Sequence, residues 1–195
     1  MKIAIDFDEV IASSFEAMLK FYHKKFGKLH KKEEFTDWDW ESVWGVSREE
    51  GIKIDLEFHE THEPMDIKPV EHALDSLRHL VIDNELFIIT NRPIKFRSKV
   101  DVWIKHHLGD LKIEIINSGD YHKGQAASKL EICKEKGISL IIEDAPYSAI
   151  PLAEGGIKVI LLDYPWNRHI NHKNIIRVKN WLEALEEIEH FKSIK

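Results

Sequence analysis

Short runs of apolar residues recur along the chain and alternate with stretches of helical periodicity. The runs fall at residues 2–7, 85–90, 112–116, 139–143 and 158–162. They are almost entirely apolar rather than alternating, which is typical of strands buried on both faces of a parallel sheet. Helical patterns fall at about 71–82, 94–108, 124–136, 147–154 and 180–191. The pattern therefore predicts an α/β fold with a Rossmann-like, doubly wound parallel sheet of five strands.

Residues 13–68 interrupt this alternation between the first strand and the helix that precedes the second. A crossover connection needs far fewer residues. The stretch has two helical patterns of its own, at 14–26 and about 47–59, separated by a polar and aromatic segment at 28–45. Pro64 and Pro69 are expected to bracket the return to the sheet. We therefore expect a core domain of residues 1–12 and 69–195, and a small helical cap of residues 13–68 inserted after strand 1.

The composition narrows the class of partner. The chain has 195 residues with 28 basic and 34 acidic side chains, a net charge of −6, which disfavours a nucleic-acid polymer or an anionic membrane as partner. A small anionic ligand stays compatible, and the basic stretch at 24–32 could steer one, although such stretches are usually solvated. With the single cysteine Cys133, no signal peptide and no apolar run long enough for a membrane span, a cytoplasmic location is expected. The oligomeric state is left open, including a homodimer.

Polar residues stand at the ends of three predicted strands. They are Asp6 and Asp8 at the first, Thr90, Asn91 and Arg92 at the second, and Glu143 and Asp144 at the fourth. Ligands of open parallel sheets bind at the carboxyl ends of the strands, so the fold should bring these residues together. Carboxylates at the ends of buried strands are costly unless they are compensated, and oxygen ligands favour Mg²⁺. A magnesium site is therefore expected at this edge of the sheet.

Four motifs follow one another in a characteristic order. They are IAIDFDEV at 3–10, IITNRP at 88–93, the lysine-headed helix KLEICKEKG at 129–137, and IIEDAP at 141–146. The set resembles the haloacid dehalogenase-like hydrolase superfamily over the whole chain, and the insertion after strand 1 matches that superfamily's first cap position. The clustered tryptophans of the insertion and the segment DYPWNR at 163–168 look like the 5′(3′)-deoxyribonucleotidase branch.

The resemblance implies a role for each motif residue. Asp6 would be the nucleophile that forms an aspartyl-phosphate, and Asp8 would protonate the leaving alkoxide and then activate water. Mg²⁺ would be held by Asp6, the backbone carbonyl of Asp8, and Asp144. Thr90 would hydrogen-bond the phosphoryl oxygens, and Lys129 would neutralise the phosphoryl group and the nucleophile. Because dehalogenases need no second aspartate, Asp8 favours phosphoryl transfer over cleavage of a carbon–halogen bond.

Some assignments keep an alternative. Lys123 lies close to Lys129 in the sequence and could reach the site instead. Asn91 and Arg92 are expected to bind substrate, but a surface salt bridge is the other interpretation for Arg92. Asn91 also stands where serine is common in the superfamily.

Two acidic residues depart from the family pattern. Glu9 stands where many members have glycine, so the turn after the nucleophile is expected to differ. Glu143 stands where the nucleotidase branch often has aspartate. It could act through a metal-bound water, or it could have only a structural role, without contact to metal or substrate.

Three tryptophans, Trp38, Trp40 and Trp44, fall within seven residues of the insertion. They could form an aromatic wall that stacks on a nucleobase, or they could fill the core of a small cap. The alternation of Trp38 and Trp40 slightly favours a shared face, and we expect these two to bind substrate.

The sequence therefore predicts a Mg²⁺-dependent phosphatase for small phosphate monoesters, with a nucleoside monophosphate as the leading substrate. One alternative is a phosphatase for another small metabolite such as a sugar phosphate. Another is a non-catalytic nucleotide-binding module on the same fold. The intact set of Asp6, Asp8, Thr90, Lys129 and Asp144 speaks against the binding module, because a pure binder needs no acid–base aspartate.

Overall fold

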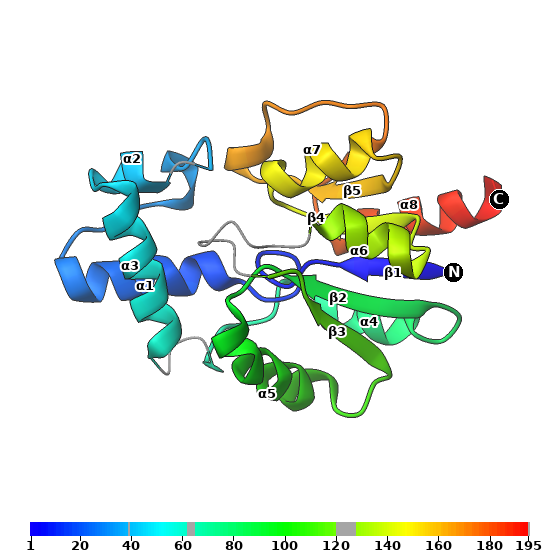
Figure 1. Cartoon of the computed structure of the whole chain (residues 1–195), viewed down its shortest axis with the longest axis horizontal. Coiled ribbons are helices and arrows are strands. Elements are labelled where there is room, and N and C mark those ends of the chain that lie inside the picture. Colours follow the sequence, from blue (N-terminus) through cyan, green and yellow to red (C-terminus); the bar gives the residue numbers. More distant parts are fainter. Residues whose placement is uncertain (39, 62–64, 120–127, 195) are drawn as a thin grey trace.

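The sheet of the computed structural model is parallel throughout and has six strands (Figure 1). The structure describes residues 1–195 except 39, 62–64, 120–127 and 195. The strands are β1 (Lys2–Ile5), β2 (Glu85–Thr90), β3 (Ile113–Asn117), β4 (Leu140–Glu143), β5 (Lys158–Leu162) and β6 (Ile175–Val178). They lie in the order β3-β2-β1-β4-β5-β6, and each neighbouring pair is parallel. Strands β2 and β3 extend the sheet on one side of β1, and β4, β5 and β6 extend it on the other. The carboxyl ends of β1, β2 and β4 therefore lie side by side.

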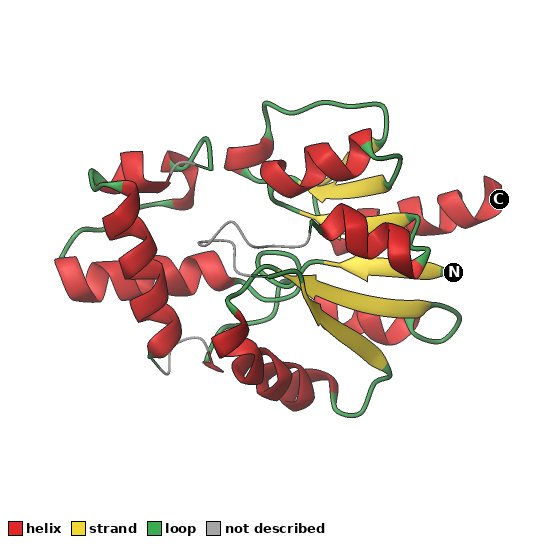
Figure 2. Cartoon of the chain, in the orientation of Figure 1, coloured by secondary structure: helices red, strands yellow, loops and turns green. Residues whose placement is uncertain are grey.

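Helices cover both faces of this sheet (Figure 2). The side chains of Ile3 and Ile5 pack with α4 (Ala73–Leu80), α5 (Arg97–Leu108) and α8 (Trp181–Ile194). Ala4 points to the opposite face and packs with α6 (Lys129–Lys136) and α7 (Pro146–Glu154). Burial on both faces is the reason that the strands are apolar at nearly every position. The doubly wound α/β fold predicted from the sequence is confirmed.

The prediction of five strands is wrong, because β6 pairs with β5 as a sixth strand. This strand lies at the edge of the sheet, and its first three residues are only half-buried. Arg177 interrupts its apolar run, so the pattern of a strand buried on both faces is missing. The other expected strands are present, with ends that differ by at most two residues. The helix expected at 124–136 is described from Lys129 onward, since 120–127 lie outside the described residues.

Three helices between β1 and α4 stand beside the carboxyl ends of the strands (Figure 1). These inserted helices are α1 (Ser14–Phe26), α2 (Trp40–Trp44) and α3 (Arg48–Glu60). The chain leaves and re-enters the core through adjacent segments, since Ser13 N–H donates to Lys68 C=O at 2.8 Å and Val70 N–H to Ile11 C=O at 2.8 Å. Pro69 lies at this return as expected, whereas Pro64 lies outside the described residues.

The inserted helices pack on one another and share the apolar core of the sheet, since Tyr22, Trp44 and Phe58 belong to the same cluster of buried side chains as Ile3 and Ile5. Tyr22 stacks on Trp44 with ring centres 4.6 Å apart, and Phe21 contacts Phe58. Short 3-10 turns complete the chain at η1 (Lys32–Glu34), η3 (Ile94–Phe96) and η5 (Pro165–Asn167). None of the described helices is both long and apolar enough to cross a lipid bilayer.

Candidate active site

The loop after β1 carries three acidic residues and is held in a tight turn. Asp6 follows the strand directly, and its backbone N–H still donates to Ile142 C=O of β4 at 3.0 Å. Glu9 has a φ of 56°, a left-handed conformation that glycine adopts at less cost. Its own side chain fixes the turn, since Oε1 accepts a hydrogen bond from Phe15 N–H at 2.7 Å. Glu9 thus has a backbone conformation that favours glycine, the residue that many members of the resembled superfamily carry at this position.

Lys129 lies between two buried carboxylates. Its ammonium is 2.6 Å from Oδ1 of Asp6 and 2.5 Å from Oε1 of Glu143. Lys129 is the first residue of α6, which Ser128 caps by accepting a hydrogen bond from Glu131 N–H. Glu143 is fully buried, and its second oxygen accepts from the N–H groups of Asp144 and Ala145. The structure thus places Lys129 at Asp6, whereas Lys123 lies outside the described residues.

Three carboxylates form an oxygen-rich cluster beside this lysine. Oxygens of Asp6, Glu143 and Asp144 all lie within 4.8 Å of one another, and all three side chains are buried. Burial raises the pKa of Asp6 to about 7, against the opposing effect of Lys129. Burial, together with the charges of Glu143 and Asp6, also raises the pKa of Asp144 well above its usual value.

The cluster fits a hard divalent cation. Among the residues that the structure describes, three buried carboxylates face one ammonium, that of Lys129, and this excess of negative charge is costly in a buried site when the cluster is ionised. Its donors are all oxygens, as Mg²⁺ prefers. The family resemblance implied Asp6, Asp144 and the backbone carbonyl of Asp8 as the ligands. The structure brings the carboxylate of Glu143 near them as a further oxygen donor. Trp166 Nε1 donates to Oδ2 of Asp144 at 3.1 Å and so orients that carboxylate.

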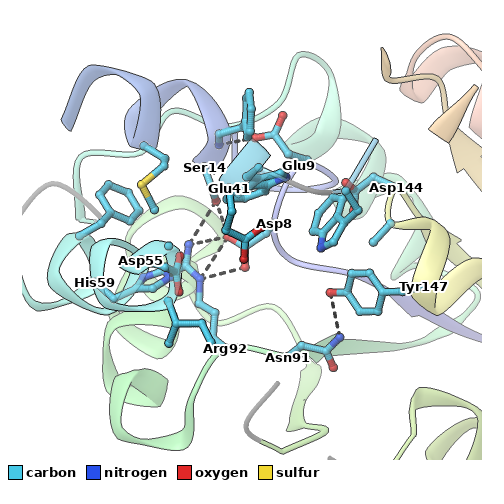
Figure 3. A pocket seen from close by; sticks show the side chains of 18 of the residues that line it. Asp8, Glu9, Ser14, Glu41, Asp55, His59, Asn91, Arg92, Asp144 and Tyr147 are labelled. Atoms are coloured by element: carbon cyan, nitrogen blue, oxygen red, sulfur yellow. Dashed lines mark hydrogen bonds and ion pairs between the residues drawn. The ribbon is translucent and has the colours of Figure 1, made fainter. Parts of the chain in front are cut away.

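Asp8 is held by Arg92 rather than left free (Figure 3). Nη2 of Arg92 lies 2.6 Å from Oδ1 of Asp8, and Nε lies 2.9 Å from Oδ2. The hydroxyl of Ser14 also donates to Oδ1. Burial alone would raise the pKa of Asp8, but the Arg92 pair and its hydrogen bonds hold that pKa below the usual value. Arg92 is buried, so the surface salt bridge considered for it is wrong.

Thr90 and Asn91, the neighbours of Arg92 in the motif IITNRP, differ in their exposure to solvent. Thr90 is fully buried at the end of β2, and its hydroxyl accepts a hydrogen bond from Arg92 N–H at 3.1 Å. Asn91 lines the pocket described below and donates to the hydroxyl of Tyr147 at 3.3 Å. Its side-chain oxygen accepts from the hydroxyl of Ser118.

A pocket of about 370 Å³ lies between the strand ends and the inserted helices. The strand ends contribute Asp6, Asp8, Asn91, Arg92 and Asp144, and the inserted helices and the segment before α2 contribute Phe15, Met18, Asp37, Trp38, Trp40, Glu41, Trp44, Arg48, Asp55 and His59. Figure 3 shows Glu41, Asp55 and His59 labelled on the same side of the pocket as Arg92 and Asp8. The pocket therefore places carboxylates, cations and aromatic rings around one space.

The tryptophans divide between pocket and core. Trp38 and Trp40 are partly exposed, with ring centres 5.2 Å apart, and Trp38 also lies 5.2 Å from the ring of Tyr147. Trp44 is only 2% exposed and stacks on Tyr22, so it belongs mainly to the apolar core. The rings of Trp38, Trp40 and Tyr147 thus lie beside one another at the pocket.

Lys32 and Tyr164, which were not expected at the site, connect the insertion and the segment after β5 to the loop that follows β1. Nζ of Lys32 lies 2.6 Å from Oε2 of Glu9 and 4.1 Å from the ring centre of Tyr164. The hydroxyl of Tyr164 donates to the backbone oxygen of Glu9 at 2.8 Å. Lys32 belongs to the basic stretch at 24–32, and the sequence of this stretch does not show which lysine pairs with a buried carboxylate and which are solvated. For Tyr164, the motif DYPWNR was the available signal.

The sequence matches one family model and two curated relatives over most of its length. Residues 1–193 match the model of the family described as "5' nucleotidase, deoxy (Pyrimidine), cytosolic type C protein". The chain is 28% identical to "Putative nucleotidase YqfW" of Bacillus subtilis over 191 residues, covering 95% of this chain and 92% of the relative. It is 26% identical over 185 residues to "Putative nucleotidase BH1399" of Halalkalibacterium halodurans, covering 94% and 90%.

Solved structures of the same fold lie further away in sequence. The haloacid dehalogenase-like family hydrolase SP0104 from Streptococcus pneumoniae superposes with a TM-score of 0.70 at 15% identity, covering 96% of this chain and 97% of that chain. The "putative HAD-hydrolase YfnB from Bacillus subtilis bound to magnesium" superposes with a TM-score of 0.61 at 13% identity, covering 96% and 97%. At these identities the two structures show the fold.

Proposed function

Because the chain belongs to the cytosolic type C 5′-nucleotidase family, within the haloacid dehalogenase-like hydrolases, we propose that it cleaves small phosphate monoesters through an aspartyl-phosphate on Asp6. Membership of this family makes the protein a phosphoric monoester hydrolase. The observation that carries the mechanism is the contact of 2.6 Å between Lys129 Nζ and Oδ1 of Asp6, inside a cluster of buried carboxylates. The finer assignments below are argued from that geometry.

Asp6 attacks phosphorus with one carboxylate oxygen while Lys129 neutralises charge on the nucleophile and on the phosphoryl group. A carboxylate and a phosphate repel each other, so a cation is needed between them. Asp6 and Asp144 would hold Mg²⁺ with the backbone carbonyl of Asp8, and Glu143 stands near enough to add an oxygen. When bound, Mg²⁺ supplies charge that shields this repulsion. Thr90 would bind phosphoryl oxygens, which requires its buried hydroxyl to become accessible.

Asp8 handles the proton in both halves of the reaction. Arg92 keeps the Asp8 carboxylate ionised before substrate binds, so Asp8 first takes a proton from the phosphate monoanion of the substrate. It gives this proton to the ester oxygen as the bond from phosphorus to that oxygen breaks and the bond to Asp6 forms. It then takes a proton from water as the water oxygen bonds to phosphorus, and the carboxylate of Asp6 is released. Asp8 lines the pocket, with its side chain about one-third exposed, so a bound ester can reach it.

A nucleoside monophosphate is the substrate that the pocket favours. Trp38, Trp40 and Tyr147 offer aromatic faces on which a base can stack. A volume of about 370 Å³ lies within the range of small-molecule sites. The family description and both relatives name nucleotidases, and the family description specifies deoxy and pyrimidine. A sugar phosphate is the alternative substrate, because it needs the phosphate site but no aromatic wall.

The wider organisation follows from this proposal. Residues 13–68 act as a cap over a core of residues 1–12 and 69–195, because the pocket lies between the inserted helices and the strand ends. The family description is consistent with a cytoplasmic location. The partner is then a small phosphorylated molecule.

The test is a panel of phosphate-release assays with Mg²⁺ on nucleoside monophosphates, sugar phosphates and p-nitrophenyl phosphate. The proposal expects turnover that EDTA abolishes and excess Mg²⁺ restores, with nucleotides preferred over sugar phosphates. A preference for sugar phosphates would select the alternative substrate. A folded protein that binds Mg²⁺ and releases no phosphate from any member would favour a binding module.

A further inference from the structure

Arg92 is fixed along its whole length before any ligand binds. Its backbone N–H donates to the hydroxyl of Thr90 at 3.1 Å, and its backbone oxygen accepts from Nδ2 of Asn117 at 3.0 Å. The guanidinium carbon lies 4.7 Å from the ring centre of Phe7, and the side chain is only 3% exposed. A long side chain held in this way has already lost most of its rotamer freedom. Any group that it binds is therefore held in one orientation.

The group that Arg92 holds is the carboxylate of Asp8. The guanidinium grips both oxygens, with Nη2 at 2.6 Å from Oδ1 and Nε at 2.9 Å from Oδ2. The Ser14 hydroxyl adds a second donor to Oδ1 and lies 3.2 Å from Nη2 of Arg92. A carboxylate oxygen can accept about two hydrogen bonds. Oδ1 is therefore occupied, while Oδ2 has Nε as its main donor and keeps a lone pair for another partner (Figure 3).

We propose that Arg92 is a positioning residue that turns Oδ2 of Asp8 toward the oxygen of the leaving group. The inference rests on the proposed function, since it needs Asp8 as the proton donor. In the first half-reaction, the bond from Asp6 to phosphorus forms and the bond from phosphorus to the ester oxygen breaks. The proton that Asp8 has taken from the phosphate monoanion of the substrate passes from Oδ2 to that oxygen, which leaves as the alcohol. Arg92 thus acts through Asp8, which differs from the substrate contact expected from the sequence.

A bidentate clamp can be separated from a simple positive charge. Lysine keeps the charge but presents one ammonium in place of a planar fork, so it cannot hold both oxygens in a fixed plane. Arg92→Lys therefore tests geometry at constant charge. Arg97→Lys is the matched control, because Arg97 also pairs with carboxylate and amide oxygens, those of Asp101 and Asn117, but does not touch Asp8.

The leaving group provides a readout that a structural role would not affect. A nucleoside alkoxide needs a proton to leave, whereas p-nitrophenolate leaves readily without one. For Arg92→Lys we expect kcat/KM to fall about 100-fold with a nucleoside monophosphate, the size of a general-acid contribution, and to change little with p-nitrophenyl phosphate. Arg97→Lys should leave both values close to wild type.

Ser14→Ala offers a milder second variant, because it removes one donor from Oδ1 and leaves Arg92 in place. It should show the same selectivity for the alkyl ester with a smaller loss. Equal losses on both substrates, or full activity of Arg92→Lys on the nucleotide, would overturn the inference. A wild-type protein that hydrolyses neither substrate would instead refute the proposed function, so the two failures are distinguishable.

Discussion

Lys129 donates to Asp6 across 2.6 Å, although the two residues are 123 positions apart in the chain. The contact exists because β1 and β4 are neighbours in the sheet and because α6 begins at Lys129. Burial alone would lower the pKa of Lys129, but the charges of Asp6 and Glu143 raise it above its usual value. The ammonium is therefore charged throughout the physiological range, which is what neutralisation of a phosphoryl group requires.

Replacement of this lysine should affect both stability and activity. Lys129→Met leaves Asp6 and Glu143 buried without their shared cation, and loss of one partner of a buried pair typically costs about 3–5 kcal/mol. Urea unfolding should show this loss, and phosphate release should fall to background. Lys134→Met is the control, since Lys134 is exposed on the same helix. Unchanged unfolding of Lys129→Met would show that the buried carboxylates need no such partner.

Magnesium binding should depend on pH. The pKa of Asp6 rises on folding from 3.8 to about 7, so the folded chain binds this proton more tightly than the unfolded chain. The contribution of Asp6 to the stability of the metal-free protein is therefore greatest below 3.8 and falls as pH rises to about 7. Asp144 acts in the same direction. Because Mg²⁺ needs both carboxylates ionised, its affinity should increase over the same range.

Thermal unfolding with and without Mg²⁺ measures this linkage. The Mg²⁺-induced rise in Tm should be larger at about pH 8 than at about pH 5.5, because fewer protons then compete for the cluster. Asp144→Asn should reduce both the shift and its dependence on pH. An equal rise at both pH values would contradict the proposed titration of the ligands.

Two tryptophans of the insertion should behave differently when truncated. Trp38→Ala should raise KM for nucleoside monophosphates about 5- to 100-fold, the range for loss of one stacked base, and leave p-nitrophenyl phosphate nearly unaffected. Trp44→Ala should instead lower the free energy of unfolding by about 3–5 kcal/mol, because Trp44 is 2% exposed. Steady-state kinetics and urea unfolding of both variants decide. A Trp38→Ala enzyme with wild-type KM would remove the base-stacking role.

The ion pair between Glu9 and Lys32 should be coupled to the turn after the nucleophile. Lys32→Met leaves the Glu9 carboxylate buried without its cation and should cost about 3 kcal/mol. The double variant Glu9→Gly, Lys32→Met should regain part of this loss, since it removes the buried charge and suits the φ of 56°. Lys25→Met, which breaks a more exposed pair with Glu57, should be close to neutral. A double variant less stable than Lys32→Met would refute the coupling.

The sequence predicted those parts of the fold that depend on local periodicity. Strands β1, β2, β4 and β5 are apolar runs because both faces are covered, and that pattern identifies them in advance. Strand β6 was not predicted, because it lies half-buried at the edge of the sheet and Arg177 interrupts its apolar run. The meeting of Asp6 with Lys129 was expected from the family motifs.

Within the site, the long-range pairs that the family motifs do not imply could not be predicted. Arg92 was expected to face substrate or solvent, and its partner Asp8 lies 84 positions earlier. The sequence does not distinguish Lys32 from the other lysines of its basic stretch, and its contact with Glu9 is known only from the fold. Trp38 and Trp44 belong to one cluster of tryptophans in the sequence, and only packing shows that Trp44 is the buried one.

The central claim is that Asp6 becomes phosphorylated during turnover. The most direct measurement is a rapid acid quench of the protein mixed with p-nitrophenyl phosphate and Mg²⁺, followed by peptide mass spectrometry. We expect phosphate on the peptide that contains Asp6, none in the Asp6→Asn variant, and no phosphate release by that variant. Phosphate release from Asp6→Asn at the wild-type rate would contradict the account.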